Sequence, residues 1–169
     1  THLAALAGAQ VFEETVFDFN KIFDRQYDAV DCHNTDDADV VFVQMGSFAT
    51  KAHDAVNKLR KAGIKAGLVR PFLVRPWPAH ALRRVLKGKK AVIVIDQNIS
   101  MGMGGVLHSE VTSALYGQPG APLTVMSVIG GLGGRDIAYA EYAELARQAL
   151  IAAEAGEIPP PRLLYTRHE

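Results

Sequence analysis

The glycine-rich stretch GGLGGRD is where the types and spacing of residues could support chemistry. Gly130, Gly131, Gly133 and Gly134 occupy four of five consecutive positions after an apolar run, and an arginine and an aspartate follow. Such turns bring backbone N–H groups close to a phosphate in many nucleotide-binding proteins. The same residues also permit positive φ and close backbone approach at a protein interface. The first question is therefore whether this loop binds a phosphate or a protein.

Neither glycine-rich turn of the chain matches a nucleotide-binding motif. The dinucleotide fingerprint requires G-x-G-x-x-G after the first strand of a βαβ unit and an acidic residue about 20 residues later. The turn at Gly102, Gly104 and Gly105 lacks the third glycine, and the loop that starts at Gly130 has a different spacing. No Gly-Lys-Ser/Thr completes a P-loop. The motifs do not predict a site for nicotinamide, flavin or a nucleoside triphosphate.

Candidate nucleophiles and metal ligands are isolated from one another. Ser47 follows Gly46, but the G-x-S-x-G of a nucleophile elbow is absent, so we expect Ser47 to cap a helix instead. His108, Ser109 and Glu110 are adjacent on an expected helix, where neighbouring side chains point in different directions. The six histidines include no pair with the spacing of a helical zinc site. We expect no catalytic residue and no metal ligand in this chain.

Four apolar runs predict the strands that must position these loops. They cover residues 40–45, 64–69, 91–95 and 123–129, and each is followed by a segment with helical spacing of its apolar residues. Continuous apolar strands that alternate with helices are typical of a parallel sheet covered on both faces. The sequence therefore predicts a three-layer α/β fold of the Rossmann-like kind, with a mostly parallel sheet.

The carboxyl ends of parallel strands form the functional edge of an open sheet. We expect Gly46, Arg70, Asp96 and Gly130 to lie along that edge. A pair between Arg135 and a carboxylate could lock two loops there; alternatively, Asp136 caps the last helix. The full set of interface or ligand-loop candidates is Gly46, Ser47, Arg70, Arg75, Asp96, Asn98, Ser100, Gly102, Gly130, Gly131, Gly133, Gly134, Arg135 and Asp136.

The chain divides into three parts. We expect an N-terminal helix and linker over residues 1–35, the α/β domain over 36–155 and an extended C-terminal arm over 156–169. Phe12, Val16, Phe19 and Phe23 mark one face of the long helix, which we expect to dock on this domain or on a neighbour. The arm is expected either to lie on a partner subunit or to be a frayed tail. The segment RPFLVRPWP, residues 70–78, is expected to be a rigid extended loop.

Composition limits the classes of partner and of cofactor. Lys+Arg and Asp+Glu both count 18, so the formal net charge is zero, which argues against nucleic acid or an anionic membrane as the main partner. Cys32 is the one cysteine, so this chain cannot form an internal disulfide or supply the thiolates of an iron–sulfur cluster. We expect a reduced, cytoplasmic setting and no membrane span.

Taken in order, the turns resemble those of a known family. Gly46-Ser47, then GIKAGLVRPFLVRPWP, DQNISMGMGG and GGLGGRD are similar to the C-terminal domain of the α subunit of the 2-oxoacid:ferredoxin oxidoreductases. Pyruvate:ferredoxin oxidoreductase, or pyruvate synthase, is the best-known member. The resemblance covers roughly residues 12–150 and implies a transketolase C-terminal-like fold. One departure is Gln97, which stands where the family pattern has an arginine.

The resemblance implies what the parent enzyme contains. Such enzymes use thiamine diphosphate with Mg²⁺ and iron–sulfur clusters, take coenzyme A as a substrate and pass electrons to ferredoxin. The resemblance also implies that this segment binds none of these cofactors. Its expected partners are the thiamine-binding and iron–sulfur domains or subunits of the same oxidoreductase, in an oligomer, with ferredoxin only an indirect partner. The alternative is a free-standing α/β binding or regulatory module with the same fold.

The resemblance favours contact of the GGLGGRD loop with a protein rather than with a phosphate. The glycines of GGLGGRD are then expected to permit positive φ in a tight loop at a subunit contact, which Arg135 and Asp136 hold in place. Contact between the loop and a phosphate of coenzyme A is the alternative. The isolated segment is expected to be inactive.

Overall fold

The computed structural model describes residues 1–164. Its centre is a six-stranded sheet in the order β1-β3-β2-β4-β5-β6, in which β1 alone is antiparallel to its neighbour. The strands are β1 (Val30–His33), β2 (Val40–Gln44), β3 (Ala66–Pro71), β4 (Ala91–Asp96), β5 (Thr124–Ile129) and β6 (Arg162–Leu163). The helices are α1 (His2–Phe23), α2 (Phe48–Lys61), α3 (Ala79–Leu86), α4 (Val106–Leu115) and α5 (Tyr139–Ala155).

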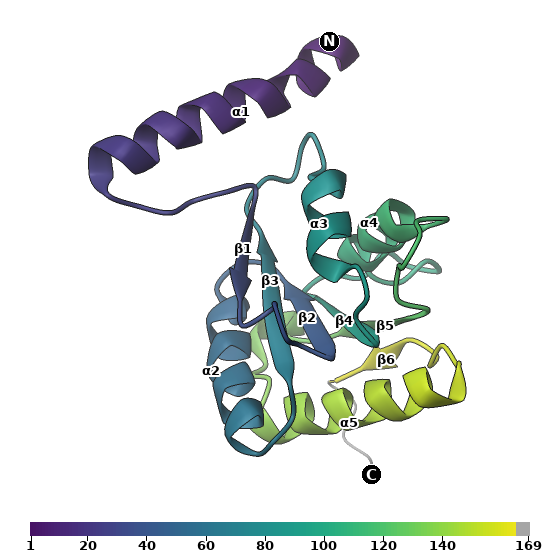
Figure 1. The fold of residues 1–169 in the computed structure, drawn as a ribbon. Coiled ribbons are helices and arrows are strands. Elements are labelled where there is room, and N and C mark those ends of the chain that lie inside the picture. Colours follow the sequence, from purple (N-terminus) through teal and green to yellow (C-terminus); the bar gives the residue numbers. More distant parts are fainter. Residues whose placement is uncertain (165–169) are drawn as a thin grey trace.

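The sheet lies between two helical layers (Figure 1). Helices α2 and α5 cover one face, and α3 and α4 cover the other. The predicted α/β fold with a mostly parallel sheet and helices on both faces is confirmed.

Strand β4 explains why the layers form on both sides. Its alternate residues Ala91, Ile93 and Ile95 pack with α2 and α5, whereas Val92 and Val94 pack with α3 and α4. Because successive side chains of a strand point to opposite faces, an unbroken apolar run must be buried on both. The run AVIVI thus determines the central position of this strand.

The sheet is wider than the four strands that the apolar runs predicted. Strand β1 pairs antiparallel with β3 through the short sequence VDCH, in which an aspartate and a histidine interrupt the apolar pattern. Strand β6 lies in the expected C-terminal arm and pairs with the end of β5. Up to Leu164, therefore, the arm completes the chain's own sheet; its remaining residues, 165–169, lie outside the described part.

The proline-rich segment differs from the expected loop at its start. Arg70 and Pro71 extend β3, which pairs with β2 only as far as Val69. Beyond that point the strand pairs with β1 alone, and Pro71 lies opposite Val30. A proline is tolerated there because it sits at a strand end near the sheet edge.

Helix α1 is longer than the pattern of phenylalanines indicated, and none of its residues is buried. It lies across one end of the sheet, apart from both helical layers (Figure 1). Within residues 1–164, no helix combines the length and the apolar character that crossing a bilayer requires.

The central strand yields a direct test of this architecture. Ile93 is fully buried in the cluster beneath α2 and α5, so we predict that Ile93→Ala lowers the free energy of unfolding by about 2–5 kcal/mol. Ile151→Ala is the matched control, because Ile151 is 66% exposed on α5 and should cost less than about 0.5 kcal/mol. Urea denaturation measures both. Equal losses in the two variants would contradict the assigned core.

Candidate functional site

The carboxyl edge of the sheet gathers three of the predicted loops. The backbone N–H of Gly130 donates to the carbonyl of Asp96, 2.9 Å away, and joins the loops after β4 and β5. Gln97 bridges these loops to the turn after β2. A Cβ added at Gly46 would lie 3.4 Å from its Oε1, and one added at Gly131 would lie 3.2 Å from its Nε2. The exposed side chain of Gln97, at the position where the family pattern has arginine, therefore lies between the turns after β2 and β5.

Asp96 is a buried carboxylate at this edge, with 1% of its surface exposed. Its Oδ1 accepts the backbone N–H of Leu107 at 2.7 Å, and its Oδ2 accepts that of His108 at 3.0 Å. These are the second and third residues of α4, whose own N-cap, Gly105, has no side chain to offer. Asp96 thus caps α4 from the neighbouring strand and satisfies donors that the helix leaves unpaired.

Gly105 makes this cap possible. A Cβ at Gly105 would overlap the Asp96 carboxylate, although the backbone there is extended and tolerates any residue. The glycine is therefore required for space and not for conformation. Burial raises the pKa of the Asp96 carboxyl, and the N–H donors from Leu107 and His108 partly oppose that effect.

The loop between Asp96 and α4 is closed on itself. Asn98 accepts the N–H of Val106 at 3.3 Å and donates to Asp96 Oδ1 at 3.3 Å. The backbones of Ser100 and Gly104 pair in both directions, at 2.8 and 2.9 Å. Gly102 adopts positive φ at the tip of this turn. The side chains of Asp96 and Asn98 and the backbone of Ser100 are thus engaged in hydrogen bonds within this loop and with the start of α4.

The turn after β2 holds Gly46 and Ser47. Gly46 has φ +69°. Ser47 directly precedes α2, as expected, but its side chain makes no capping hydrogen bond. The structure therefore gives Ser47 the position of an N-cap without the side-chain interaction that the sequence predicted for it.

The GGLGGRD loop has two halves with different roles. Gly130 leaves room for the C-terminal segment, because a Cβ there would lie 2.9 Å from Leu164 and 3.0 Å from Ile137. Gly133 and Gly134 adopt φ of +62° and +79° and have open space where a side chain would stand. The outer half of the loop thus needs glycine for its conformation and is exposed.

Two ion pairs hold the far end of this loop. Arg135 Nη1 lies 3.2 Å from Glu141 Oε1 in the first turn of α5, and Asp136 pairs with Lys51 of α2. The N-cap of α5 is Ala138 and not Asp136; Glu141 Oε2 accepts the Ala138 N–H at 2.8 Å. The structure thus joins Arg135 to a carboxylate on the next helix. All four charged side chains are partly exposed, so each pair contributes little stability.

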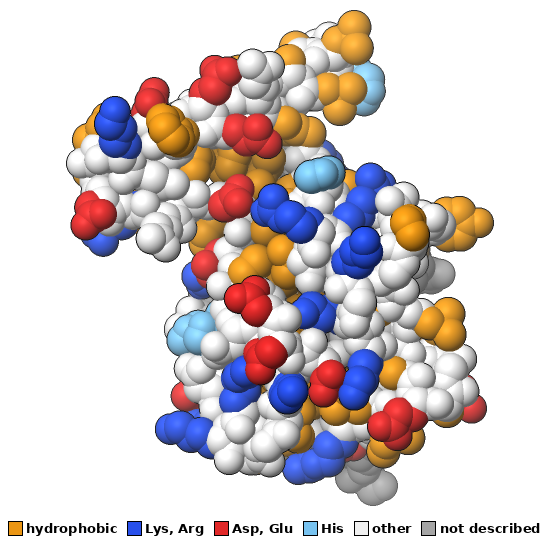
Figure 2. All heavy atoms as spheres, in the orientation of Figure 1, with side chains coloured by type: hydrophobic (Ala, Val, Ile, Leu, Met, Phe, Trp, Pro, Cys, Tyr) orange, Lys and Arg blue, Asp and Glu red, His pale blue; other side chains and the backbone are white. Residues whose placement is uncertain are grey.

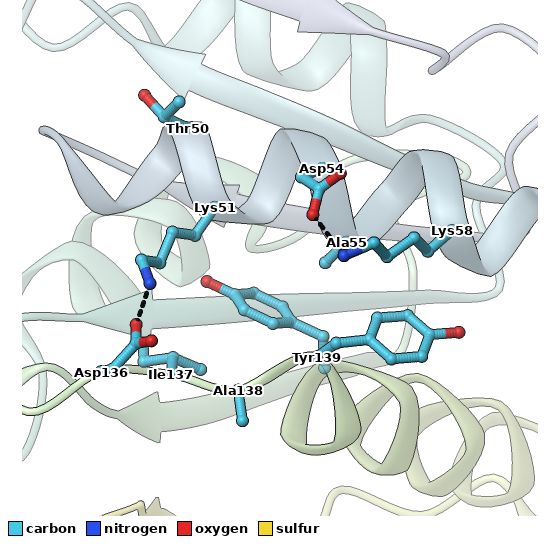
Figure 3. A pocket seen from close by; sticks show the side chains of 10 residues that line it. Thr50, Lys51, Asp54, Ala55, Lys58, Asp136, Ile137, Ala138 and Tyr139 are labelled. Atoms are coloured by element: carbon cyan, nitrogen blue, oxygen red, sulfur yellow. Dashed lines mark ion pairs between the residues drawn. The ribbon is translucent and has the colours of Figure 1, made fainter.

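A cavity of about 350 Å³ lies beside the loop, between α2 and the start of α5 (Figure 3). Figure 3 shows Lys51 directed at Asp136, and Lys58 directed at Asp54, within this cavity. Lys58 Nζ also lies 5.7 Å from the centroid of the Tyr139 ring. Because each lysine has a carboxylate partner, the cavity has no excess positive charge that would favour a phosphate.

Behind the cavity, Tyr142 ties α5 to the end of β2. Its hydroxyl donates to Gln44 Oε1 at 3.0 Å inside the core, and burial raises its pKa. The hydroxyl therefore stays protonated and serves as a structural donor, not as a base.

Arg70 and Arg75 are engaged elsewhere. Arg70 donates to Asp31 of β1 at 2.7 Å and lies over the ring of Phe72. Arg75 pairs with Glu110 of α4 at 2.5 Å. Both arginines thus hold neighbouring elements of the sheet edge and the helical layer, and neither is paired with the glycine loops.

One cluster escaped the sequence reasoning. The rings of His33 and His53 stack with centroids 3.7 Å apart, and Asn57 approaches both rings, at 2.8 and 3.4 Å. Burial and the neighbouring His33 lower the pKa of His53. His33 lies on β1 and His53 on α2, so only the folded chain brings them together; a histidine in VDCH was too weak a sequence signal to predict the stack.

The residues present do not fit the metal groups of the parent enzymes. Among the described residues, no three of the His, Cys, Asp or Glu side chains converge on a common point. The sequence has one cysteine, whereas a cubane cluster is held by about four thiolates. We therefore assign no step to a metal or cluster in this chain.

Comparison with known proteins identifies relatives. The family model described as pyruvate:ferredoxin oxidoreductase core domain II matches residues 38–142. Pyruvate synthase subunit PorA of Pyrococcus abyssi is 35% identical over 152 residues, which are 90% of this chain and 38% of that protein. Ketoisovalerate oxidoreductase subunit VorA of the same organism is 33% identical over 150 residues, 88% of this chain and 38% of that protein. The chain thus spans less than two-fifths of these relatives.

Solved structures share the fold. A split-gene transketolase has a TM-score of 0.59 at 20% identity, over 76% of this chain and 44% of that one. The 2-oxoglutarate:ferredoxin oxidoreductase of Magnetococcus marinus has a TM-score of 0.54 at 21% identity, over 78% of this chain and 21% of that one. At these identities the likeness concerns the fold alone, and it confirms the transketolase C-terminal-like prediction.

Alanine substitutions at two glycines test the fit between Asp96 and the start of α4. We predict that Gly105→Ala lowers the free energy of unfolding by about 1–3 kcal/mol, because the new methyl group displaces the Asp96 carboxylate. Gly63→Ala is the control; it has positive φ and open space, so it reports conformational strain alone, about 1–2 kcal/mol.

A double-mutant cycle separates the two causes. Asp96→Ala should destabilise the wild type by about 0.5–2 kcal/mol through loss of the cap, but should cost much less in the Gly105→Ala background. It should cost the same in wild type and in Gly63→Ala. Additive losses for Asp96 and Gly105 in urea denaturation would contradict the proposed fit.

Proposed function

The chain belongs to the family of pyruvate:ferredoxin oxidoreductase core domain II, and from this premise we propose that it is an architectural domain of a 2-oxoacid:ferredoxin oxidoreductase. In this role it positions neighbouring domains or subunits and does not itself carry out the chemical steps. Its partners would be the thiamine-binding and iron–sulfur parts of the same enzyme, in the cytoplasm.

One observation carries this proposal. The carboxylate with the best position for chemistry, Asp96 at the carboxyl edge, is occupied on both oxygens by N–H groups of its own chain. Asn98 is used in the same cap. What the edge presents outward is the exposed glycine turn at Gly133 and Gly134. A carboxylate with both oxygens engaged, beside an exposed turn, suits contact with a partner better than catalysis.

The reaction of the complete enzyme follows from the names of the relatives. The pyruvate synthase subunit and the ketoisovalerate oxidoreductase subunit have nearly the same sequence identity to this chain, 35% and 33%. We therefore propose a 2-oxoacid as the substrate class, with pyruvate as the first candidate. The carboxylate of the 2-oxoacid would leave as CO₂, the acyl group would be oxidised and joined to the thiol of coenzyme A, and ferredoxin would accept the electrons. Thiamine diphosphate, with Mg²⁺, would supply the carbanion chemistry outside this chain.

Turnover assays test the assignment. We predict that the enzyme purified with its complete subunits forms acyl-CoA and reduces ferredoxin from pyruvate and coenzyme A, and that this 169-residue chain alone does neither. Assays with pyruvate and with 2-oxoisovalerate in parallel identify the acid. Turnover by the chain alone would refute the architectural role, and a complete enzyme inactive on every 2-oxoacid would refute the family reaction for this protein.

The exposed glycine turn provides a second test, with a matched control. Gly133 and Gly88 both have positive φ and open space for a side chain, but Gly88 lies before β4, at the opposite edge of the sheet from Gly133. Valine at either position should cost about 1–3 kcal/mol of backbone strain. In the complete subunit, we predict that Gly133→Val also weakens association with the partner subunits.

Size-exclusion chromatography, melting temperature and coenzyme A affinity distinguish the outcomes. Loss of association in Gly133→Val alone, with similar melting shifts in both variants, supports the interface role. Normal association with selectively weakened coenzyme A binding would show instead that the turn contacts that ligand.

A further inference from the structure

Helix α1 forms one wall of an apolar groove. Phe12, Thr15, Val16 and Phe19 of α1 lie on one side, and Tyr27, Asp28 and Phe72 lie on the other, around a space of about 440 Å³. Figure 2 shows hydrophobic side chains in the region between α1 and the body of the molecule. An apolar concavity of this kind at a protein surface is typical of a binding site.

Hydrogen bonds of Asn20 tie the end of α1 to the segment that follows it. Asn20 donates to the carbonyl of Tyr27 and accepts its N–H, both at 2.8 Å, and Asn20 also accepts the N–H of Arg25 through its carbonyl. These bonds set the direction in which the chain leaves α1. The segment through Tyr27, which lines the groove, is therefore fixed against the end of α1.

A row of aromatic rings continues from the helix to the sheet. Phe23 and Phe19 lie 4.6 Å apart, Phe19 and Tyr27 5.8 Å, and Tyr27 and Phe72 6.0 Å, between ring centroids. All four rings are more than two-fifths exposed. Rigid aromatic side chains that remain exposed in a preformed row lose little conformational entropy when a partner covers them.

We propose that this groove holds an apolar segment of the same subunit polypeptide that lies outside these 169 residues. The match to core domain II starts at residue 38, after α1. The helix therefore precedes the matched domain, where it can contact a neighbouring domain of the subunit. The relatives are much longer than this chain, which covers 38% of the PorA subunit. A segment on the same polypeptide also has a high effective concentration at the groove.

A second copy of the chain fits the groove less well. A twofold axis would bring the same surface of both copies together, and two concave grooves leave each other unfilled unless each copy inserts a convex element. Helix α1, the protruding element of this chain, is itself the wall of the groove. These shapes therefore favour an occupant other than a second copy of the chain.

Photo-crosslinking in the complete subunit tests the proposal. A benzophenone amino acid replaces Phe12, which lines the groove, or Phe17, which is 69% exposed on α1 and does not line it. Mixing normal and ¹⁵N-labelled subunits separates products within one polypeptide from products between two. We expect the Phe12 position, and not the Phe17 position, to form same-polypeptide products with residues outside 1–169. Products of mixed isotope composition, products with a different polypeptide, or none at Phe12 would overturn the proposal.

Hydrogen exchange supplies an independent readout. In the complete subunit, Phe12→Asp should raise the exchange rates of the α1 amides at least about tenfold, because the segment that covers them is released. Phe17→Asp, the same chemical change outside the groove, should leave them within about twofold of wild type. Equal effects of the two variants would overturn the proposal. Neither measurement depends on turnover, so failure here would leave the proposed activity untouched.

Discussion

The burial of one carboxylate determines the arrangement of the carboxyl edge. Asp96 ends the central strand, and its two oxygens accept the N–H groups of the second and third residues of α4. A buried carboxylate is costly unless it is fully hydrogen-bonded, so the strand, the loop and the helix must keep a single relative position. Gly105 is the position at which any side chain would break that fit. The loop after β5 joins the same unit through the Asp96 carbonyl.

This constraint divides the edge into two parts. The Asp96 carboxylate and Asn98 are engaged by the protein itself and maintain the scaffold. Farther out, Gly133 and Gly134 have positive φ and open space where a side chain would stand, so glycine is favoured there for conformation and not for internal packing. The ion pairs of Arg135 and Asp136 connect this exposed turn to α5 and α2. The result is a rigid scaffold that presents a shaped loop, which is what an interface domain needs.

The same fold occurs in a transketolase and in a 2-oxoacid:ferredoxin oxidoreductase at low sequence identity. Fold alone therefore does not assign a role, and the proposed role depends on which groups the scaffold leaves free. Helix α1, which lies apart from both helical layers (Figure 1), adds a second surface. Its aromatic rings are exposed, and Asn20 fixes the segment that follows the helix. This surface indicates that the domain makes contacts through more than one side.

The sequence by itself determined the layered α/β architecture. The unbroken apolar runs require burial on both faces, and the intervening helices follow from local periodicity, so these features depend on residues close together in the chain. The sequence did not predict strands β1 and β6, because their few residues form strands only through pairing with β3 and β5. The order of residues also placed Asp96 and the glycine loop at one edge. Only the tertiary structure decided that Asp96 caps α4, that Gln97 lies between the turns after β2 and β5 and that Arg135 pairs with Glu141. Each of these depends on which backbone or side chain the folded chain brings within hydrogen-bonding distance, and local spacing contains no such information.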